Sequence, residues 1–247
     1  MRHTFACSDL HGMMSLYKQI KDFLKPDDIV YFLGDASDRG EENWNTLKKI
    51  MMDPQFIYLK GNHEDMLQKT MKDFIVNGET GYRNYSILTQ NGGMTTYQGW
   101  LEETNSDKIL WYQRIANLPL WLTYDNKDGK KIFLSHAGFV FDIDEKGEPI
   151  IPEAEDLLWD RSHYFCKTIH DIPKHWMMVH GHTPIEYLFQ DLRLQFGKEE
   201  TPEPEYPMAY WYDNHRKCCI DNGCFYTGTI VLLDLDTFEE HQFYTEI

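Results

Sequence analysis

Five short polar clusters carry the side chains in this sequence that could do chemistry, and each follows a run of apolar residues. Their aspartate, asparagine and histidine side chains supply oxygen and imidazole nitrogen donors, which suit Mn²⁺, Fe or Zn²⁺. No cluster contains cysteine, so a thiolate site is not expected. The clusters are residues 9–12 (DLHG), 34–40 (GDASDRG), 61–64 (GNHE), 136–138 (HAG) and 181–183 (GHT).

Donors of this kind indicate a hydrolytic reaction. Two divalent ions about 3.5–4 Å apart can share one carboxylate and one water molecule. The shared water loses a proton near neutral pH and becomes a nucleophile, while the ions offset the charge of an attacked phosphoryl group. The clusters therefore favour a two-metal site that hydrolyses phosphate esters.

Each cluster taken alone has an ordinary explanation. Aspartate and asparagine favour turns after strands, and His136 or His182 alone would more often be a hydrogen-bonded core histidine. Five clusters in order, each at the end of a predicted strand, are hard to explain as turns. We therefore interpret them as one site.

The elements that must position the clusters can be predicted from the apolar pattern. Apolar runs at residues 4–8, 29–33 and 56–59 are of the buried-strand type. Helical spacing of apolar residues after each run predicts three helices, and this βαβαβα order favours a largely parallel sheet. The carboxyl ends of such strands form the edge where α/β sheets bind ligands.

Residues 77–105 break this order because they contain five glycines and scattered aromatic residues. We predict an irregular segment there and a short helix near residues 106–116, so that 77–120 forms an insertion or cap. Without a repeat or a boundary, residues 1–247 are expected to form a single domain. The remaining predictions are strands at 132–134 and 177–179, a surface loop over 195–217, and a strand–turn–strand unit from 229–235 to 241–244.

The clusters resemble those of the calcineurin-like metallophosphoesterases. GDxxDRG followed by GNHE is similar to the phosphoprotein phosphatase superfamily in particular, which includes Ser/Thr protein phosphatases and symmetrical diadenosine tetraphosphatases. The resemblance extends from Asp9 to residues 220–224 (IDNGC), which are similar to an "IDTG" strand of bacterial members. It implies an α/β fold, an αββα sandwich of two mixed β-sheets flanked by helices.

The resemblance also implies a ligand set for two divalent metal ions, with Mn²⁺ expected and Fe or Zn²⁺ as alternatives. Asp9 and His11 correspond to ligands of the first ion, and Asp35 to the ligand that bridges both. The residues that correspond to ligands of the second ion are Asn62, His136 and His182.

Four further residues are implied to act on the substrate. His63 resembles the histidine that protonates the leaving group, and Asp38 resembles the carboxylate that orients it. Arg39 resembles a phosphate-binding arginine, and Arg161, in a W-x-R segment with Trp159, a second one. Arginine suits this task because its planar guanidinium binds phosphate oxygens in pairs. Asn62 is expected to contact the substrate as well.

The sequence departs from many members of this family at the fifth cluster. Thr183-Pro184 follows His182 where Gly-His-x-His is common. The missing histidine favours the phosphoprotein phosphatase branch over the nucleases and phosphodiesterases. Residues 91–93 (NGG) resemble a bacterial phosphatase element, although an ordinary turn explains them equally well. Glu64 is expected only to open the third helix, where an acidic residue suits the helix dipole.

Composition limits the partners of the protein. The net charge is −16 in 247 residues, and the sequence pI is near 5.0, which argues against sequence-independent binding of nucleic acid. No apolar stretch is long enough to span a membrane, and the first residues lack a signal-peptide pattern, so we expect a cytoplasmic protein. Five cysteines without C-x-x-C spacing indicate reduced thiols, and a zinc site built from His215, Cys218, Cys219 and Cys224 fits no common template.

Three functions remain open at the level of the sequence. The favoured one is hydrolysis of phosphate monoesters in phosphorylated proteins, specifically at phosphoserine and phosphothreonine, with small phosphoesters as other substrates. The second is hydrolysis of dinucleoside polyphosphates, in which Tyr82, Tyr85, Tyr97 and Trp100 of the insertion would stack bases. We favour a packing role for these four residues over base stacking. The third is a catalytically inactive phosphate-binding module. The sequence does not indicate an oligomeric state.

Overall fold

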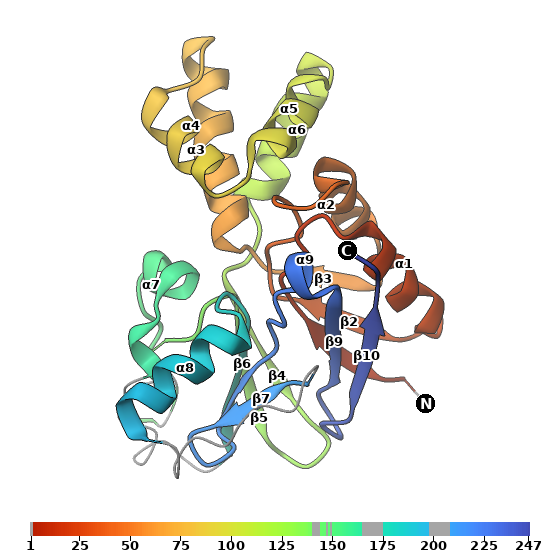
Figure 1. The fold of residues 1–247 in the computed structure, drawn as a ribbon, viewed down its shortest axis with the longest axis vertical. Coiled ribbons are helices and arrows are strands. Elements are labelled where there is room, and N and C mark those ends of the chain that lie inside the picture. Colours follow the sequence, from red (N-terminus) through yellow and green to blue (C-terminus); the bar gives the residue numbers. More distant parts are fainter. Residues whose placement is uncertain (1, 140–143, 147, 149, 165–174, 198–207) are drawn as a thin grey trace.

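Two five-stranded sheets pack against each other at the centre of the protein, and helices flank both of them (Figure 1). The structure is a computed structural model that describes residues 2–139, 144–146, 148, 150–164, 175–197 and 208–247. The expected αββα sandwich of two mixed sheets is confirmed.

The first sheet has the strand order β10-β9-β1-β2-β3. Its first three strands in the chain run parallel, as predicted, whereas β9 and β10 are antiparallel additions that make the whole sheet mixed. The strands are β1 (Thr4–Cys7), β2 (Ile29–Phe32), β3 (Phe56–Tyr58), β9 (Thr229–Asp234) and β10 (Glu240–Tyr244).

The second sheet has the strand order β4-β5-β6-β8-β7, with β5, β6 and β8 parallel. The strands predicted at 132–134 and 177–179 are confirmed as β5 and β6. The loop predicted over 195–217 is wrong where β7 and β8 form, and residues 198–207 lie outside the described part. The strands are β4 (Trp121–Asp125), β5 (Lys131–Ser135), β6 (Trp176–His180), β7 (Tyr210–Tyr212) and β8 (Lys217–Cys219).

Alternating side chains divide the core into layers, because successive residues of a strand face opposite sides of its sheet. In β5, Ile132 and Leu134 point into the layer between the sheets, together with Val231 of β9. Phe133 points the other way, toward the helix side of the second sheet. The two sheets therefore share one buried apolar layer that fixes their relative position.

Helices cover the outer face of each sheet and extend beyond it. In Figure 1, α1 and α2 flank the first sheet, and α7 and α8 flank the second, while α3–α6 project as a helical extension from the edge where β3 ends. The helices are α1 (Met14–Phe23), α2 (Asn43–Met52), α3 (Asn62–Asn77), α4 (Tyr82–Gln90), α5 (Met94–Leu101), α6 (Asn105–Ala116), α7 (Ala154–Trp159), α8 (Ile185–Phe196) and α9 (Cys224–Thr227), with a 3₁₀ turn at η1 (Ser162–Tyr164).

The prediction of an irregular segment at 77–105 is wrong, because α4 and α5 form there. The glycines separate helices instead of preventing them. Gly78 ends α3 in the left-handed conformation (φ 75°), and Gly81 and Gly93 precede the first residues of α4 and α5. The helix predicted near 106–116 is confirmed as α6.

The aromatic residues of this extension mostly build its core. Trp100 is fully buried, its ring packs against those of Phe74 and Tyr97, and its indole N–H donates to the Lys108 carbonyl. Tyr97 is buried as well, whereas Tyr82 is 86% exposed. The preference for packing over base stacking is therefore confirmed for Trp100 and Tyr97.

Within the part of the chain that the structure describes, no helix has the length and hydropathy needed to cross a bilayer.

Replacing Trp100 with alanine should lower the free energy of unfolding by about 3–5 kcal/mol, because a large side chain leaves a packed core. Urea denaturation followed by circular dichroism measures this change. Tyr82→Ala is the matched control and should stay within about 0.5 kcal/mol of the wild type. Equal effects of the two substitutions would contradict the packing described for the extension.

Candidate metal centre

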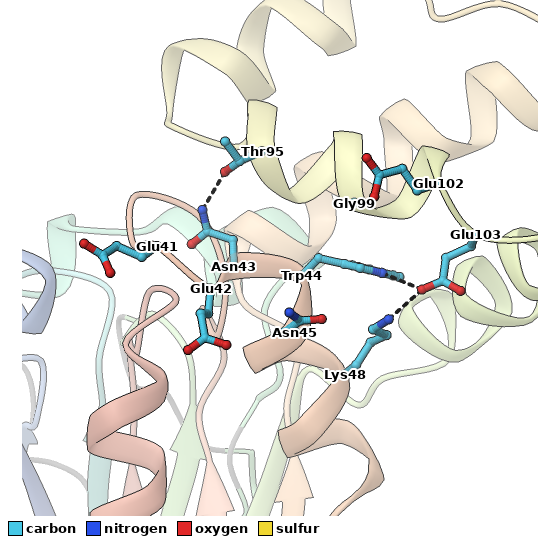
Figure 2. Close-up of a pocket in the computed structure, with 10 residues that line it drawn as sticks. All are labelled: Glu41, Glu42, Asn43, Trp44, Asn45, Lys48, Thr95, Gly99, Glu102 and Glu103. Atoms are coloured by element: carbon cyan, nitrogen blue, oxygen red, sulfur yellow. Dashed lines mark hydrogen bonds and ion pairs between the residues drawn. The ribbon is translucent and has the colours of Figure 1, made fainter.

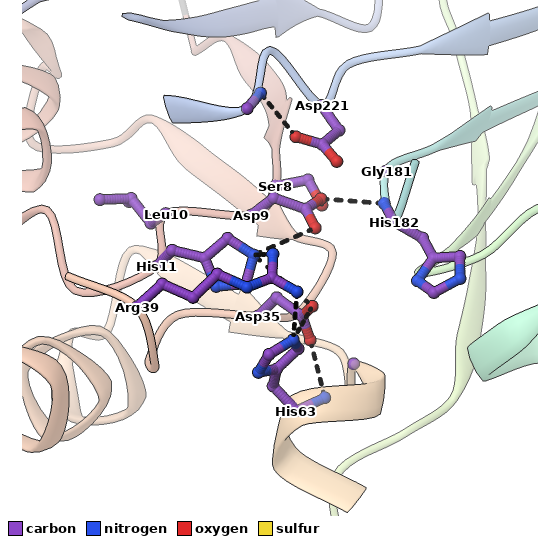
Figure 3. A network of polar contacts seen from close by, with 12 residues as sticks. Ser8, Asp9, Leu10, His11, Asp35, Arg39, His63, Gly181, His182 and Asp221 are labelled. Carbon is purple, nitrogen blue, oxygen red and sulfur yellow. Dashed lines mark hydrogen bonds and ion pairs between the residues drawn. The ribbon is translucent and has the colours of Figure 1, made fainter. Parts of the chain in front are cut away.

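The polar clusters meet at one edge of the sandwich because the strands before them are tied together there. The backbone N–H groups of Asp9 and His11 donate to the carbonyls of Gly34 and Asp35, both at 3.0 Å. Within the second sheet, the Gly181 N–H donates to the His136 carbonyl at 2.8 Å. Between the two sheets, the His182 N–H donates to Asp9 Oδ2 at 3.0 Å. These bonds bring together the ends of β1, β2, β5 and β6. Figure 3 shows the residues that follow β1, β2 and β6 beside His63 at the start of α3.

The backbone is strained at this edge. Non-glycine residues rarely have a positive φ, and holding one costs about 1–3 kcal/mol. Such strain persists only where the surrounding structure fixes the conformation, and it collects at functional sites. Six of the residues predicted for the site have it, namely Asp9, His11, Asp35, Asp38, Arg39 and His182.

The Asp35 carboxylate lies at the centre of the cluster. Its Oδ2 is 3.4 Å from His136 Nε2, 3.7 Å from His63 Nε2 and 3.9 Å from His11 Nε2. Two overlapping groups of donors that could hold metal ions share this carboxylate: one adds His11 and His63, and the other adds Asp9 and His136.

Hydrogen bonds fix the orientation of two imidazoles toward Asp35. His11 Nδ1 is 2.9 Å from the Ser37 carbonyl, and His136 Nδ1 is 2.7 Å from the Leu33 carbonyl. Because a carbonyl only accepts, each Nδ1 carries the proton, and each Nε2 presents a lone pair toward Asp35. Metal-binding histidines are held in this way by backbone carbonyls.

A second convergence of donors surrounds the Asn62 side chain. Its Oδ1 is 2.7 Å from His136 Nε2 and 3.1 Å from His182 Nδ1. Buried His182 Nε2 and Asp9 Oδ1 have no hydrogen-bond partner. Buried polar atoms without partners are costly, so the donor set fits bound cations.

Burial dominates the electrostatics of the cluster. It raises the pKa of Asp35 well above its usual range, and the carboxylates of Glu64 and Asp9 raise this pKa further. Burial also lowers the pKa values of His11 and His182 well below the usual range for histidine. The site therefore combines buried carboxylates with neutral imidazoles, and a bound cation would stabilise the ionised carboxylates.

His63, Asp38 and Arg39 form a chain of hydrogen bonds beside Asp35. His63 Nδ1 is 2.6 Å from Asp38 Oδ2, and the Arg39 guanidinium contacts His63 Nε2 at 3.0 Å and His11 Nε2 at 2.8 Å. Because a guanidinium only donates, His63 Nε2 accepts from Arg39, and the proton of His63 is on Nδ1, which donates a hydrogen bond to Asp38. Burial raises the pKa of Asp38 to about 7, while burial and Arg39 lower the pKa of His63.

Arg161 lies at the rim of the cluster. Its Nε donates to the Thr183 hydroxyl at 3.0 Å, next to His182, and its charge contributes to the lowered pKa of that histidine. The structure thus brings all ten predicted site residues to one region, with Arg161 exposed at its edge.

Glu64 supports the centre in a way that sequence reasoning missed. The residue is fully buried, and one carboxylate oxygen accepts from the N–H groups of Asp35 (2.8 Å) and Gly61 (2.9 Å). The other accepts from Ala36 N–H (3.2 Å) and the Tyr58 hydroxyl (2.8 Å). Glu64 therefore opens α3, as expected, and also holds the loop that carries Asp35.

The NGG element is part of the site support rather than an ordinary turn. The Gly92 carbonyl accepts from Arg39 N–H at 3.3 Å, and a Cβ at Gly92 would crowd the Arg39 side chain. A Cβ at Gly93 would collide with Leu88 and approach Asp38. Thr96 of α5 donates to the Asp38 carboxylate. The extension therefore positions the loop of Asp38 and Arg39.

The end of β8 adds residues that were noted only by resemblance. Asp221 is buried, its pKa is raised by burial and by Asp9, and it accepts from Gly223 N–H at 2.8 Å (Figure 3). Cys224 Sγ donates to the Asp9 carbonyl at 2.9 Å. The Phe225 ring lies 5.0 Å from the Arg39 guanidinium and edge-on to His11.

The late histidine and cysteines do not form a second centre among the described residues. Cys218 packs between the sheets, Cys219 packs on the opposite side of β8, and Cys224 contacts the Asp9 loop. His180 is bonded to the Tyr212 hydroxyl at 2.7 Å.

Comparisons with known proteins give a family match and a similar bacterial protein. A sequence model of the family described as calcineurin-like phosphoesterase matches residues 3–216. The chain is 27% identical over 200 residues to Serine/threonine-protein phosphatase 2 of Salmonella typhimurium (strain LT2), an alignment that covers 75% of this chain and 82% of that protein.

Solved structures show the same fold. A candidate diadenosine tetraphosphatase aligns with a TM-score of 0.58 at 12% identity, covering 99% of this chain and 94% of that chain. A metallophosphoesterase from Sphaerobacter thermophilus aligns with a TM-score of 0.54 at 12% identity, covering 99% and 88%. At this identity the likeness concerns the fold alone.

Glu64→Gln should lower both the stability of the protein and its affinity for Mn²⁺, although the side chain keeps its shape. In either orientation the new NH₂ group faces at least one backbone N–H, which costs about 1–3 kcal/mol of stability. Displacing the loop of Asp35 should also weaken Mn²⁺ binding about tenfold or more, as measured by calorimetric titration. Glu79→Gln, at an exposed position, is the control; identical behaviour of the two variants would show that Glu64 does not position Asp35.

Proposed function

The chain belongs to the calcineurin-like phosphoesterase family, and we propose that it is a two-metal phosphoesterase that acts on phosphoserine and phosphothreonine in proteins. The observation that carries this proposal is the buried Asp35 carboxylate, which faces the Nε2 atoms of His11 and His136 across 3.9 and 3.4 Å. A carboxylate between two lone-pair donors is suited to bridge two cations.

The donor set assigns residues to each ion. Asp9, His11 and Asp35 would hold one ion, and Asp35 would hold the other together with Asn62, His136 and His182. The chemistry that two bound divalent ions supply is neutralisation of phosphoryl charge and a lowered pKa for the water that attacks phosphorus. Oxygen and imidazole donors without thiolate favour Mn²⁺, with Fe or Zn²⁺ as alternatives.

The arginines bind the phosphoryl group in this proposal. Arg39 donates to His11 and His63 and is backed by the Phe225 ring, so its guanidinium already lies at the centre. A phosphate dianion is a stronger acceptor than either imidazole and would draw Arg39 toward its oxygens. Arg161, held by Thr183 at the rim, approaches the same group from the second sheet.

His63 and Asp38 supply the proton for the leaving oxygen. When Arg39 turns to the phosphate, His63 Nε2 loses the donor that keeps it unprotonated and can take up a proton from solvent water. The Asp38 carboxylate at His63 Nδ1 stabilises the resulting imidazolium. The protonated Nε2 then donates to the leaving-group oxygen, which is general acid catalysis.

Phosphoproteins are the favoured substrates for two reasons. The similar Salmonella protein is a Ser/Thr protein phosphatase. Tyr97 and Trp100, which would stack bases of a dinucleotide, are buried in the extension. The matching ligand set and the His63–Asp38 pair argue against an inactive binding module. Acidic charge disfavours nucleic acid and polyphosphates as partners at long range.

A dinucleoside polyphosphate hydrolase is the second candidate. The observation in its favour is the half-buried Phe225 ring beside Arg39, because an aromatic face next to a phosphate site could stack a base.

His63→Asn should lower kcat by about 10²–10⁴-fold on alkyl phosphates such as a phosphothreonine peptide. The loss should be much smaller on p-nitrophenyl phosphate, whose leaving group needs little protonation. Metal content, measured by elemental analysis, should be unchanged, and Asp38→Asn should follow the same dependence on the leaving group. Equal losses on both substrates, or loss of metal, would remove His63 from this role.

Under one Mn²⁺ condition, kcat/KM should be at least tenfold higher for phosphothreonine peptides than for diadenosine tetraphosphate, or about 1.4 kcal/mol in transition-state binding. Phe225→Leu should lower both activities by a similar factor, because its ring supports Arg39. A tenfold preference for the dinucleotide would reverse the assignment of substrate. So would a loss in Phe225→Leu that is confined to the dinucleotide.

A further inference from the structure

A groove on the outer surface between α1 and α2 has no role in the proposed reaction. It consists of two adjoining hollows that share Lys49 and Met52. The first hollow also contains Met14, Lys18, Lys48 and Glu42, and the second contains Lys21 and Asp53. None of these residues belongs to the metal centre, and we refer to them together as the α1–α2 groove.

The charge of the groove is opposite to that of the protein. Four lysines and two acidic residues line it, in a chain whose net charge is −16. Lys21 pairs with Asp53 at 2.8 Å, and Lys48 pairs with Glu103 at 2.6 Å. Lys18 and Lys49 have no ion pair with any residue that the structure describes. Their positive charges are therefore available to a partner.

The centre of the groove is apolar and exposed. Met52 is 57% exposed, and its sulfur contacts the Arg114 guanidinium. An unbranched thioether adapts its shape to an incoming side chain, and methionine is overused at binding surfaces for this reason. An apolar anchor ringed by cations suits a ligand that has an aliphatic side chain between carboxylates.

A hollow that adjoins the groove has the opposite character. Figure 2 shows a hollow between α2 and α5 that is lined by the glutamates Glu41, Glu42, Glu102 and Glu103, with Lys48 drawn toward Glu103. The groove shares Glu42, Asn45 and Lys48 with this hollow. The glutamates repel acidic ligands, so an acidic segment is favoured at the end of the groove that carries Lys18 and Lys49.

We propose that the α1–α2 groove docks an acidic peptide segment of another protein. An aliphatic side chain of that segment packs on Met52, and its carboxylates pair with Lys18 and Lys49. Nucleic acid fits less well, because two unpaired lysines neutralise few phosphates. Tyr17, the aromatic residue of the groove, is buried with its hydroxyl bonded to Asp53 and offers no face to a base.

Fluorescence anisotropy of the full chain tests this proposal with a short labelled peptide that has two central leucines flanked by glutamates. Its affinity should exceed that of the same peptide with glutamines by at least tenfold and should fall with added salt. Lys18→Glu combined with Lys49→Glu should weaken binding tenfold or more, and Met52→Gln should weaken it at constant charge. Lys72→Glu, an exposed lysine of α3, should change nothing.

Several results would overturn the proposal. The proposal fails if the glutamate peptide does not bind or if both peptides bind equally. It also fails if the charge-reversed variant binds the glutamate peptide as the wild type does while its thermal melting is unchanged. Tighter binding of a single-stranded oligonucleotide would assign the groove to nucleic acid. Self-association that the double charge reversal abolishes would assign it to a second copy of the chain. The binding readout does not depend on phosphatase activity.

Discussion

The burial of the Asp35 carboxylate is the constraint on which the rest of the structure depends. Burial and two neighbouring carboxylates raise its pKa, so the ionised form is costly unless positive charge lies close to it. The surrounding side chains offer lone pairs from imidazoles and other carboxylates, which make the cluster a cation site rather than an ion pair. Arg39 is a cationic side chain that contacts His11 and His63 beside Asp35, and in the proposed reaction it is also the group that phosphate attracts.

The fold supplies the rigidity that this cluster needs. The apolar layer between the sheets fixes β1, β2, β5 and β6 relative to one another, and short backbone hydrogen bonds join the loops that follow them. Glu64 and the NGG turn then hold the loops of Asp35 and Asp38 from the helical side. Six strained backbone positions are retained as a result, because the surroundings fix them from several directions.

Apolar runs in the sequence predicted strands of both sheets correctly, whereas glycine content did not predict the helices of the extension. The runs predicted β1, β2, β3, β5 and β6. The polar residues after these strands predicted the position of the metal centre, because the carboxyl ends of parallel strands lie at one edge of a sheet. Glycine content misled the prediction for α4 and α5, since glycines that end helices look the same in sequence as glycines in loops. The bond from Gly61 N–H to Glu64 is a local contact at the start of α3, but the bonds from Asp35 and Ala36 could not be predicted, because only tertiary structure brings their loop to Glu64. The short β7 and β8 likewise owe their conformation to pairing within the second sheet.

Metal content measured together with activity tests the central claim most directly. Protein reconstituted with Mn²⁺ should contain about two ions per chain and hydrolyse an aryl phosphate, and exhaustive chelation should abolish that activity. Asp35→Asn should lower the occupancy of both ions together. A substitution at a ligand of one ion, such as His11→Asn, should lower mainly the occupancy of that ion. Full activity in protein shown by elemental analysis to be free of metal would contradict the account.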